Sequence, residues 1–263
     1  MQIPNINENL SEEQIKCLEA FAKSCRRSIL EMTTNAASGH PGGSLSSIDY
    51  LSLIYTFIIG QTGEKIVISN GHISPAVYSI LAEMGYANKE DVIQNFRKIG
   101  SLFEGHVTRH VAGIWYGTGP LGAGSSAATG FALGEKLKKT NEKVFLTIGD
   151  GECQEGQVYE MINFASHYKL DNLITFIDYN KVQLTASLEE IMNLNLQKIF
   201  DAAGWHVIDA DAHNFQNMWQ CLKEAYEVKN KPIVILGNSI MGKGVPSMEQ
   251  DGINHKSTWH GKT

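Results

Sequence analysis

Short, unbroken apolar runs that alternate with helix-length segments constrain the fold of this chain more than any other feature. The runs lack polar–apolar alternation and lie at 65–69, 144–148, 173–177, 206–208 and 233–236. Strands of this kind are buried on both faces, as in parallel sheets. The segments between them have the length of helices and fall near 75–84, 122–139, 156–168, 194–203 and 215–228. We therefore expect an α/β fold, a parallel β-sheet with helices on both faces.

The region before the first run is expected to be helical. Ser11 and Gln14 form a capping-box pattern, which predicts a helix that starts there and continues toward Asn35. A Gly-rich break at 38–43 precedes a second helical stretch near 47–57. No linker, repeat or low-complexity tract divides the sequence, so we expect residues 1–263 to form one domain.

The composition disfavours several classes of protein. The chain has 263 residues, of which 43% are hydrophobic, and this is enough to bury a substantial core. Its formal net charge of −6 argues against nucleic acid or an anionic membrane as the partner. The longest apolar stretch, Leu51–Ile59, is far shorter than the ~20 residues that span a bilayer. The four cysteines form no CxxC pair and the N-terminus lacks signal-peptide lysines, so we expect a cytoplasmic protein with reduced thiols.

Polar residues follow two of the predicted strands at the end where parallel α/β sheets bind ligands. Asp150 follows the second run between two glycines, and Asn180 follows the third. Together they offer two hard oxygen ligands with one formal charge, which suits Mg²⁺ that keeps waters and phosphate oxygens as its other ligands. The helix expected to start after Glu155 would direct N–H groups at an anion. The alternative is an ordinary Asp-Gly turn.

Four of the nine histidines lie beside Gly or Pro in turns: His40, His72, His106 and His260. Histidines held by loops on a rigid scaffold are candidates for catalysis or hydrogen bonding. His106 and His110 also have HxxxH spacing, but the glutamate of HExxH and a third ligand are missing, so a zinc site is disfavoured.

The stretch Gly117–Gly122 matches the GxGxxG dinucleotide pattern. The run before it is short and interrupted, and no acidic residue ends a second strand ~20 residues later, as ribose recognition requires. Close helix packing or a phosphate that approaches backbone amides explains these glycines better than a nicotinamide cofactor does.

These motifs together resemble the amino-terminal half of transketolases, which binds the diphosphate of thiamine diphosphate. The resemblance covers nearly the whole chain in the family's order, through SGHPGGSLS (38–46), SNGHISPAVY (69–78), FRKIGSLFEGH (96–106), GTGPLGAG (117–124), IGDGECQEGQVYE (148–160), HYKLDNLITFIDYN (167–180) and GKGVPSMEQ through WHGK (242–262). The family's form with two separate subunits fits best, because the sequence stops just after WHGK.

The resemblance implies a role for each matching residue. Asp150 and Asn180 correspond to Mg²⁺ ligands, with the backbone carbonyl of Val182 as a third. The histidines at 40, 72 and 260 match residues around the diphosphate and the reaction centre, and His106 matches one that contacts the donor's hydroxyls. The remaining positions that correspond to cofactor contacts or to the subunit contact are Gly119, Pro120, Leu121, Gly151, Leu184, Glu155 and Glu160.

The resemblance also implies a partner. In this family a glutamate on the carboxyl-terminal, pyrimidine-binding half activates the cofactor, and that half carries most sugar-phosphate contacts. We therefore expect activity only with such a partner subunit, as a heterotetramer of two of each chain, on sugar or sugar-phosphate substrates. The activity would be transfer of a two-carbon ketol unit from a ketose donor to an aldose acceptor, with thiamine diphosphate as electron sink.

Several positions depart from the family's pattern. Trp115 and Tyr116 stand where smaller residues are usual, so we expect them to narrow the sugar channel. Glu152 adds a negative charge beside the diphosphate loop, and Arg97 matches a family arginine that a surface ion pair would explain equally well. Two alternatives remain open at this point: a 2-oxo acid dehydrogenase α-like subunit, and a non-catalytic binding module of the same fold.

Overall fold

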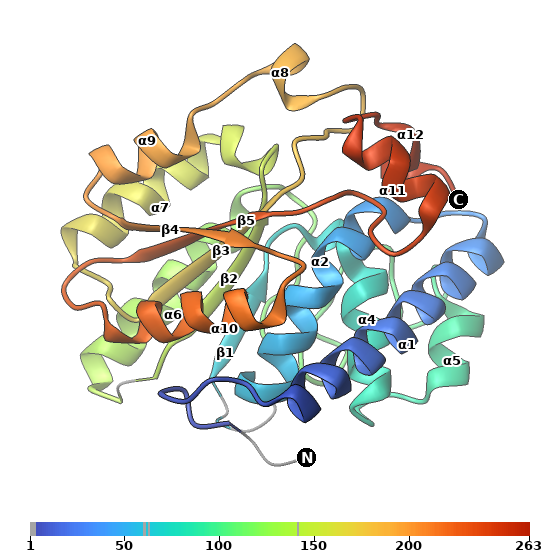
Figure 1. Ribbon diagram of the computed structural model, residues 1–263, viewed down its shortest axis with the longest axis horizontal. Helices are drawn as coiled ribbons and strands as arrows, with labels where there is room; N and C mark the ends of the chain where they lie inside the picture. The colour runs from blue at the N-terminus through green and yellow to red at the C-terminus, as the bar shows by residue number, and fades with distance from the viewer. Residues whose placement is uncertain (1–3, 60–61, 63, 141) are drawn as a thin grey trace.

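The computed structural model describes residues 4–263 except 60, 61, 63 and 141. Within that part, parallel strands form one sheet in the order β1-β2-β3-β5-β4 (Figure 1). The strands are β1 (Lys65–Ile68), β2 (Val144–Gly149), β3 (Leu173–Tyr179), β4 (His206–Asp211) and β5 (Ile233–Asn238). Each of the five apolar runs is therefore a strand, and the central three are buried over nearly their whole length. None of the described helices is long and apolar enough to cross a membrane.

Helices cover both faces of the sheet. One face packs against α1 (Glu12–Ala36), α2 (Pro41–Ile54), α4 (Ser74–Glu83) and α10 (Phe215–Glu227). The other face packs against α6 (Ala123–Lys138), α7 (Gly156–His167) and α9 (Leu196–Ala202). Neighbouring strand residues alternate between the two cores, as Phe145 and Leu146 of β2 do. Both layers therefore depend on the unbroken apolar character of the strands.

Two helical boundaries differ from the sequence prediction. The second helix begins at Pro41 rather than near residue 47, because Pro at the first helical position already has the required φ and needs no N–H partner. Its end continues into a π-helical turn, η1 (Tyr55–Ile59). All fourteen residues of α2 are buried, so it is a central helix rather than an amphipathic surface one.

Some short elements were not expected. They are α5 (Lys89–Asn95), α8 (Leu188–Ile191), α11 (Pro246–Ile253) and α12 (Thr258–Gly261), together with the short 3₁₀ helices η2 (Gly71–Ile73) and η3 (Glu152–Gln154). A four- to eight-residue helix spans too few turns to show a helical period in sequence. The last two α-helices matter most, because α12 returns to pack against α2 (Figure 1). This contact joins the two ends of the sequence beside the carboxyl end of the sheet.

Candidate functional site

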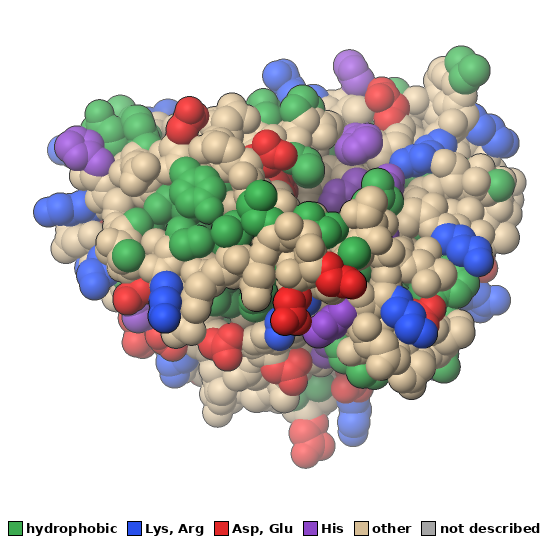
Figure 2. All heavy atoms as spheres, turned by 90° about the horizontal axis from the view of Figure 1, so that it is seen from above, with side chains coloured by type: hydrophobic (Ala, Val, Ile, Leu, Met, Phe, Trp, Pro, Cys, Tyr) green, Lys and Arg blue, Asp and Glu red, His purple; other side chains and the backbone are tan. Residues whose placement is uncertain are grey.

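The carboxyl ends of the strands meet at one end of the molecule. Strand register pairs Gly149 with Asp178 and Asp178 with Gly237, so the segments that follow β2, β3 and β5 are neighbours. Figure 2 looks onto this end, where histidine side chains gather in a hollow with acidic side chains beside it. The structure thus brings together the polar strand ends that the sequence singled out.

Asp150 and the turn that contains Asn180 are directly connected. The Asp150 carboxylate accepts hydrogen bonds from the backbone N–H of Lys181 (2.6 Å) and of Gly151 (2.7 Å). In the same turn, Asn180 Oδ1 accepts from the N–H of Val182 (2.9 Å). Asp150, Asn180 and Val182, the three predicted metal ligands, therefore lie within one small group of turns.

The pKa of the Asp150 carboxyl group lies far from its ordinary value. Burial and the neighbouring Asp178 raise the pKa of Asp150 to about 7. No group of three or more His, Cys, Asp or Glu side chains suited to a metal occurs among the described residues. A metal held here would thus use one carboxylate, an amide oxygen and backbone, which is a donor set for Mg²⁺ rather than for zinc.

Two buried amides beside these turns lack partners within the part of the chain that the structure describes. Gln183 Nε2 has no hydrogen-bond acceptor there, and Asn70 Oδ1 has no donor. A Cβ atom added to Gly151 would come within 3.2 Å of the Gln183 side chain, so glycine keeps that space open. A backbone turn with an open cradle and an unused amide donor fits a bound phosphate group. The residues present are therefore compatible with a Mg²⁺-diphosphate.

Asp178 is a structural acid behind the site. It is buried and accepts from Ser46 (2.6 Å) and Ser47 (3.1 Å) of α2, as well as from Ser239 and from Asn180 Nδ2 (3.1 Å). It thereby joins α2 to β3 and fixes the amide of Asn180. This role was not foreseen, because nothing in sequence distinguishes the last acid of a buried strand.

Glu152 lies beside the predicted diphosphate loop, with its carboxylate turned into the protein. Its carboxylate is 3% exposed and accepts from Ser69 Oγ (2.5 Å) and from the backbone N–H groups of Gly122 (2.7 Å) and Gly149 (3.3 Å). It connects the ends of β1 and β2 to the start of α6. The sequence placed this acid beside the loop, and the structure adds the hydrogen-bond donors that surround it.

Three of the four loop histidines form a close cluster. The ring centroids of His40 and His72 are 5.2 Å apart, those of His40 and His260 5.8 Å, and those of His72 and His260 5.6 Å. Gly42 and Gly43 of α2 permit this, because a Cβ on Gly42 would collide with the backbone oxygen of Trp259 and one on Gly43 would come within 3.4 Å of His72. A backbone hydrogen bond from Gly242 to Gly42 holds the same approach.

All four loop histidines are kept neutral. Burial lowers the pKa of His40 to about 4, and it lowers the pKa of His72, His106 and His260 below the ordinary value. Mutual repulsion contributes, since His106 lowers the pKa of both His40 and His72. The cluster therefore offers imidazoles that can each donate and accept one hydrogen bond at neutral pH.

Arg97 belongs to this cluster and is not a surface ion pair. Its guanidinium donates to Ser38 Oγ (2.6 Å) and lies 3.5 Å from His40 Nδ1. No acidic side chain pairs with it among the described residues. Sequence reasoning gave it too little weight, although its place in the matched stretch 96–106 was a usable signal.

The other predicted cofactor contacts lie nearer the surface. Gly119, Pro120 and Leu121 form an exposed turn just before α6, and Leu184 is 63% exposed and reaches toward Gly261. Glu155 and Glu160 are exposed at the start of α7 and along it.

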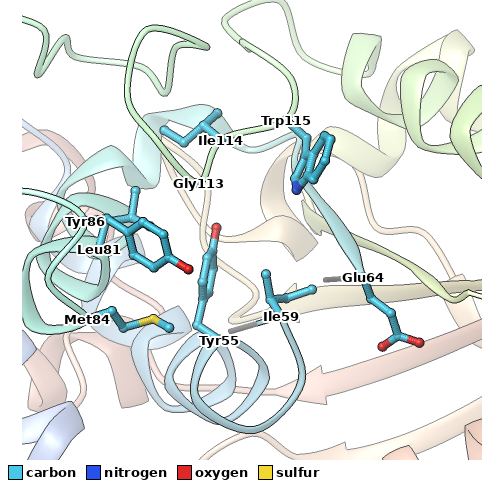
Figure 3. A pocket seen from close by; sticks show the side chains of 9 residues that line it. All are labelled: Tyr55, Ile59, Glu64, Leu81, Met84, Tyr86, Gly113, Ile114 and Trp115. Atoms are coloured by element: carbon cyan, nitrogen blue, oxygen red, sulfur yellow. The ribbon is translucent and has the colours of Figure 1, made fainter. Parts of the chain in front are cut away.

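Trp115 does not narrow the site. It lines a pocket of about 350 Å³ with Tyr55, Ile59 and Tyr86, shown in Figure 3. Its ring also lies under the ammonium of Lys65, 5.3 Å away, at the amino end of β1. That is the opposite end of the sheet from the histidines, whereas Tyr116 is half-buried and packs against the core of the other layer. For Trp115 the expected narrowing of a sugar channel was wrong, because its side chain lies at the far end of the sheet.

Comparison with known proteins identifies the family. Residues 18–261 match the model for the family described as "Transketolase, thiamine diphosphate binding domain". The chain belongs to that family. It is 36% identical over 256 residues to the 6-deoxy-6-sulfo-D-fructose transketolase subunit of Clostridium sp. (strain MSTE9), with 94% of this chain and 92% of that relative covered. It is 32% identical to one of the subunits of the apulose-4-phosphate transketolase of Phocaeicola vulgatus, with 94% and 89% covered.

Longer transketolases and solved transketolase structures are also similar to this chain. Human transketolase is 32% identical over 262 residues, and the chain spans only 40% of its length. The crystal structure of transketolase from Campylobacter jejuni superposes with a TM-score of 0.86 at 29% identity, with 94% of this chain and 40% of that chain covered. A Pichia stipitis transketolase complex with sedoheptulose 7-phosphate gives 0.85 at 27% identity, with 93% and 38% covered. The expected fold and the expected resemblance to the amino-terminal subunit of two-subunit transketolases are confirmed.

Proposed function

We propose that this chain holds the Mg²⁺-diphosphate end of thiamine diphosphate in an enzyme that transfers a two-carbon ketol unit from a ketose to an aldose. The observation that carries the proposal is the placement of Asp150 and Asn180 at the same end of the sheet as three clustered neutral histidines. The first group suits a metal-bound diphosphate, and the second suits the hydroxyl and carbonyl oxygens of a sugar.

The residues around the diphosphate would act by position. Asp150, Asn180 and the carbonyl of Val182 would hold Mg²⁺, while Gly151 and Gln183 would leave space and an N–H donor for the phosphate oxygens. Thiamine diphosphate, when bound, supplies the carbanion and electron sink for cleavage next to a carbonyl. The turn at 119–121 and the exposed side chain of Leu184 would border the rest of that cofactor.

The histidines would handle protons and sugar oxygens. His40, His72 and His260 are neutral, so each can donate to a developing alkoxide or accept from a hydroxyl. His106 is close enough to influence the charges of His40 and His72, and we assign it to the donor's hydroxyls. All four rings are half-buried, so part of each remains accessible to a bound sugar.

A second subunit would complete the site. Several large apolar side chains outside the strands are exposed, with Leu121 43%, Leu184 63% and Met192 51% exposed. We propose that a carboxyl-terminal, pyrimidine-binding transketolase subunit covers them and supplies the activating glutamate, in a heterotetramer of two of each chain located in the cytoplasm. The relatives named for apulose 4-phosphate and for 6-deoxy-6-sulfo-D-fructose motivate sugar phosphates and sulfonates as candidate donors.

Reconstitution tests the proposal. The chain would be co-purified with a transketolase carboxyl-terminal subunit, titrated with thiamine diphosphate and Mg²⁺ in a calorimeter, and assayed with xylulose 5-phosphate, fructose 6-phosphate and 6-deoxy-6-sulfofructose as donors. We expect saturable cofactor binding, ketol transfer with at least one donor, and no turnover by this chain alone. Absence of cofactor binding by the pair would indicate a non-catalytic module, and CO₂ release from a 2-oxo acid without ketol transfer would indicate the dehydrogenase alternative.

A further inference from the structure

Arg97 occupies a place that is built for a guanidinium beside His40. Its Nη1 donates to Ser38 Oγ at 2.6 Å, and its Nη2 lies 3.5 Å from His40 Nδ1. A Cβ atom on Gly105 would come within 2.8–3.0 Å of the guanidinium, so a larger residue at 105 would displace it from its present position. The backbone at Arg97 adopts a left-handed φ of 60°, and its N–H donates to the carbonyl of Phe103. Such a conformation costs a non-glycine residue free energy, and the surrounding contacts hold it.

We propose that Arg97 is a positioning residue that holds His40 as the tautomer with its proton on Nε2. A guanidinium only donates hydrogen bonds and does not lose its proton in proteins. The ring nitrogen that faces it must therefore be an acceptor, so Nδ1 of His40 carries a lone pair and Nε2 carries the hydrogen. The opposite tautomer would direct an N–H at the N–H groups of the guanidinium.

The rest of the cluster supports a neutral ring. Burial lowers the pKa of His40 to about 4, with further contributions from His260, Arg97 and His106, so the imidazole has one proton to place at pH 7. Within the described residues, the His40 ring makes no hydrogen bond other than the one to Arg97. Gly39, with φ 145°, lies against Thr33 where a Cβ would clash, and this tight turn aims His40 at His72 and His260.

The inference assigns His40 a direction of proton donation. With the hydrogen on Nε2, His40 can donate from that nitrogen to an oxygen atom of a bound ligand, and Nε2 does not accept a proton in its resting state. Its use on a sugar oxygen or alkoxide rests on the proposed function, whereas the tautomer is a property of this chain by itself.

Nitrogen-15 NMR of the full chain labelled at histidine tests the tautomer at pH 7.5. Two-bond ring correlations distinguish a pyridine-type nitrogen from a pyrrole-type one, and the loss of cross-peaks in His40→Gln assigns the signals. We expect pyridine-type Nδ1 and pyrrole-type Nε2 for His40. A pyrrole-type Nδ1 would overturn the inference, and this readout on the native chain does not depend on how well a variant folds.

Variants then test the role of Arg97. Arg97→Met should move the His40 shifts toward the average of two exchanging tautomers, and Arg97→Lys should do the same, because a single ammonium cannot reach both Ser38 and His40 as the forked guanidinium does. Arg27→Met, which removes an exposed arginine paired with Glu31, should leave the His40 signals unchanged. Unchanged His40 shifts in a folded Arg97→Met chain would contradict the inference. Thiamine diphosphate binding by the reconstituted pair is measured separately, so its failure would count against the proposed function and not against the tautomer.

Discussion

Two buried acidic groups of this chain are built in opposite ways. Asp49 of α2 accepts from Arg26 (2.6 Å) and His213 (2.9 Å), and Arg26 also donates to the carbonyl of Lys243 (3.0 Å). Asp150 is equally buried, but its carboxylate accepts from backbone N–H groups and lies near a second acid, Asp178. The first group is complete within the chain, whereas the second becomes neutral only when a proton or a cation is added.

The pKa shifts follow this difference. Burial acts to raise the pKa of Asp49, but the hydrogen bonds from His213 and Arg26 lower it below its ordinary value. For Asp150, burial and Asp178 raise the pKa to about 7. The two carboxyl groups are equally buried, but their pKa values shift in opposite directions. A lowered pKa, as for Asp49, is typical of an ion pair that stabilises the fold, whereas a raised pKa, as for Asp150, is typical of a site that binds a cation or a proton.

The largest expected effect comes from breaking the complete group. Asp49→Ala should lower the free energy of unfolding by about 3–5 kcal/mol, because it leaves Arg26 and His213 buried without their partner. Urea denaturation of this chain measures the change. Glu31→Ala, which removes an exposed ion pair with Arg27, is the control and should cost under about 0.5 kcal/mol. Equal losses for the two variants would show that the buried group does not stabilise the fold.

Removal of the incomplete group's carboxylate should instead affect binding. Asp150→Ala in the reconstituted pair should weaken Mg²⁺-dependent thiamine diphosphate binding about 100-fold, since even the loss of a group behind a metal ligand weakens metal binding about 10–100-fold. Calorimetric titration measures the affinity, and Asp201→Ala on the exposed side of α9 is the control. Full affinity in Asp150→Ala would refute the assignment of a metal ligand.

Filling the space beside Gly151 should weaken thiamine diphosphate binding less than the loss of Asp150 does. Gly151→Ala places a methyl group 3.2 Å from Gln183, at a backbone φ of −65° that alanine adopts freely, so the fold should persist. We expect affinity to fall about tenfold, which corresponds to about 1.4 kcal/mol. Gly156→Ala, whose new methyl group would meet nothing within 4 Å, is the matched control. If both alanines bind alike, Gly151 does not leave space for the phosphate.

The smallest effect is the acid dependence of stability that Asp49 contributes. Because its folded-state pKa lies below the unfolded value of 3.8, the stabilisation is present above that value and is lost as the pH falls through the folded-state pKa. Urea denaturation at pH 5 and at pH 3 measures this slope. The free energy of unfolding of Asp49→Asn should decline less between pH 5 and pH 3 than that of the native chain. An identical decline in both would show that Asp49 does not contribute to the pH dependence of stability.

Sequence predicted most of the fold because the strands are buried on both faces. An unbroken apolar run such as Leu173–Ile177 has few other uses in a chain of this composition, and every such run is a strand. The capping box at Ser11 and Gln14 likewise fixed the start of α1 through contacts three residues apart. Elements whose signals lie between near neighbours, or repeat along a segment, can therefore be predicted from sequence.

Sequence predicted which residues form the site better than it predicted what surrounds them. Turns rich in Gly and Pro marked the loop histidines, and strand ends marked Asp150 and Asn180. Arg97 and Trp115 were misjudged, and the partners of Glu152 were not foreseen, because what a charged or aromatic side chain does depends on whether it faces solvent, and sequence does not record that. The tertiary structure places the Glu152 carboxylate against backbone N–H groups and the Trp115 ring beside Lys65, at the far end of the sheet.

By itself, the sequence determined the parallel sheet, its helical layers and the residue types at the strand ends, because short-range periodicity and turn chemistry act between near neighbours. The tertiary structure decided which of those residues meet. His40 and His260 lie near opposite ends of the chain and become neighbours only because Gly42 lets the last helix lie against the first turn of α2. Charge and tautomer at the site follow from that proximity, since burial and neighbouring dipoles, not residue identity, set where a proton resides.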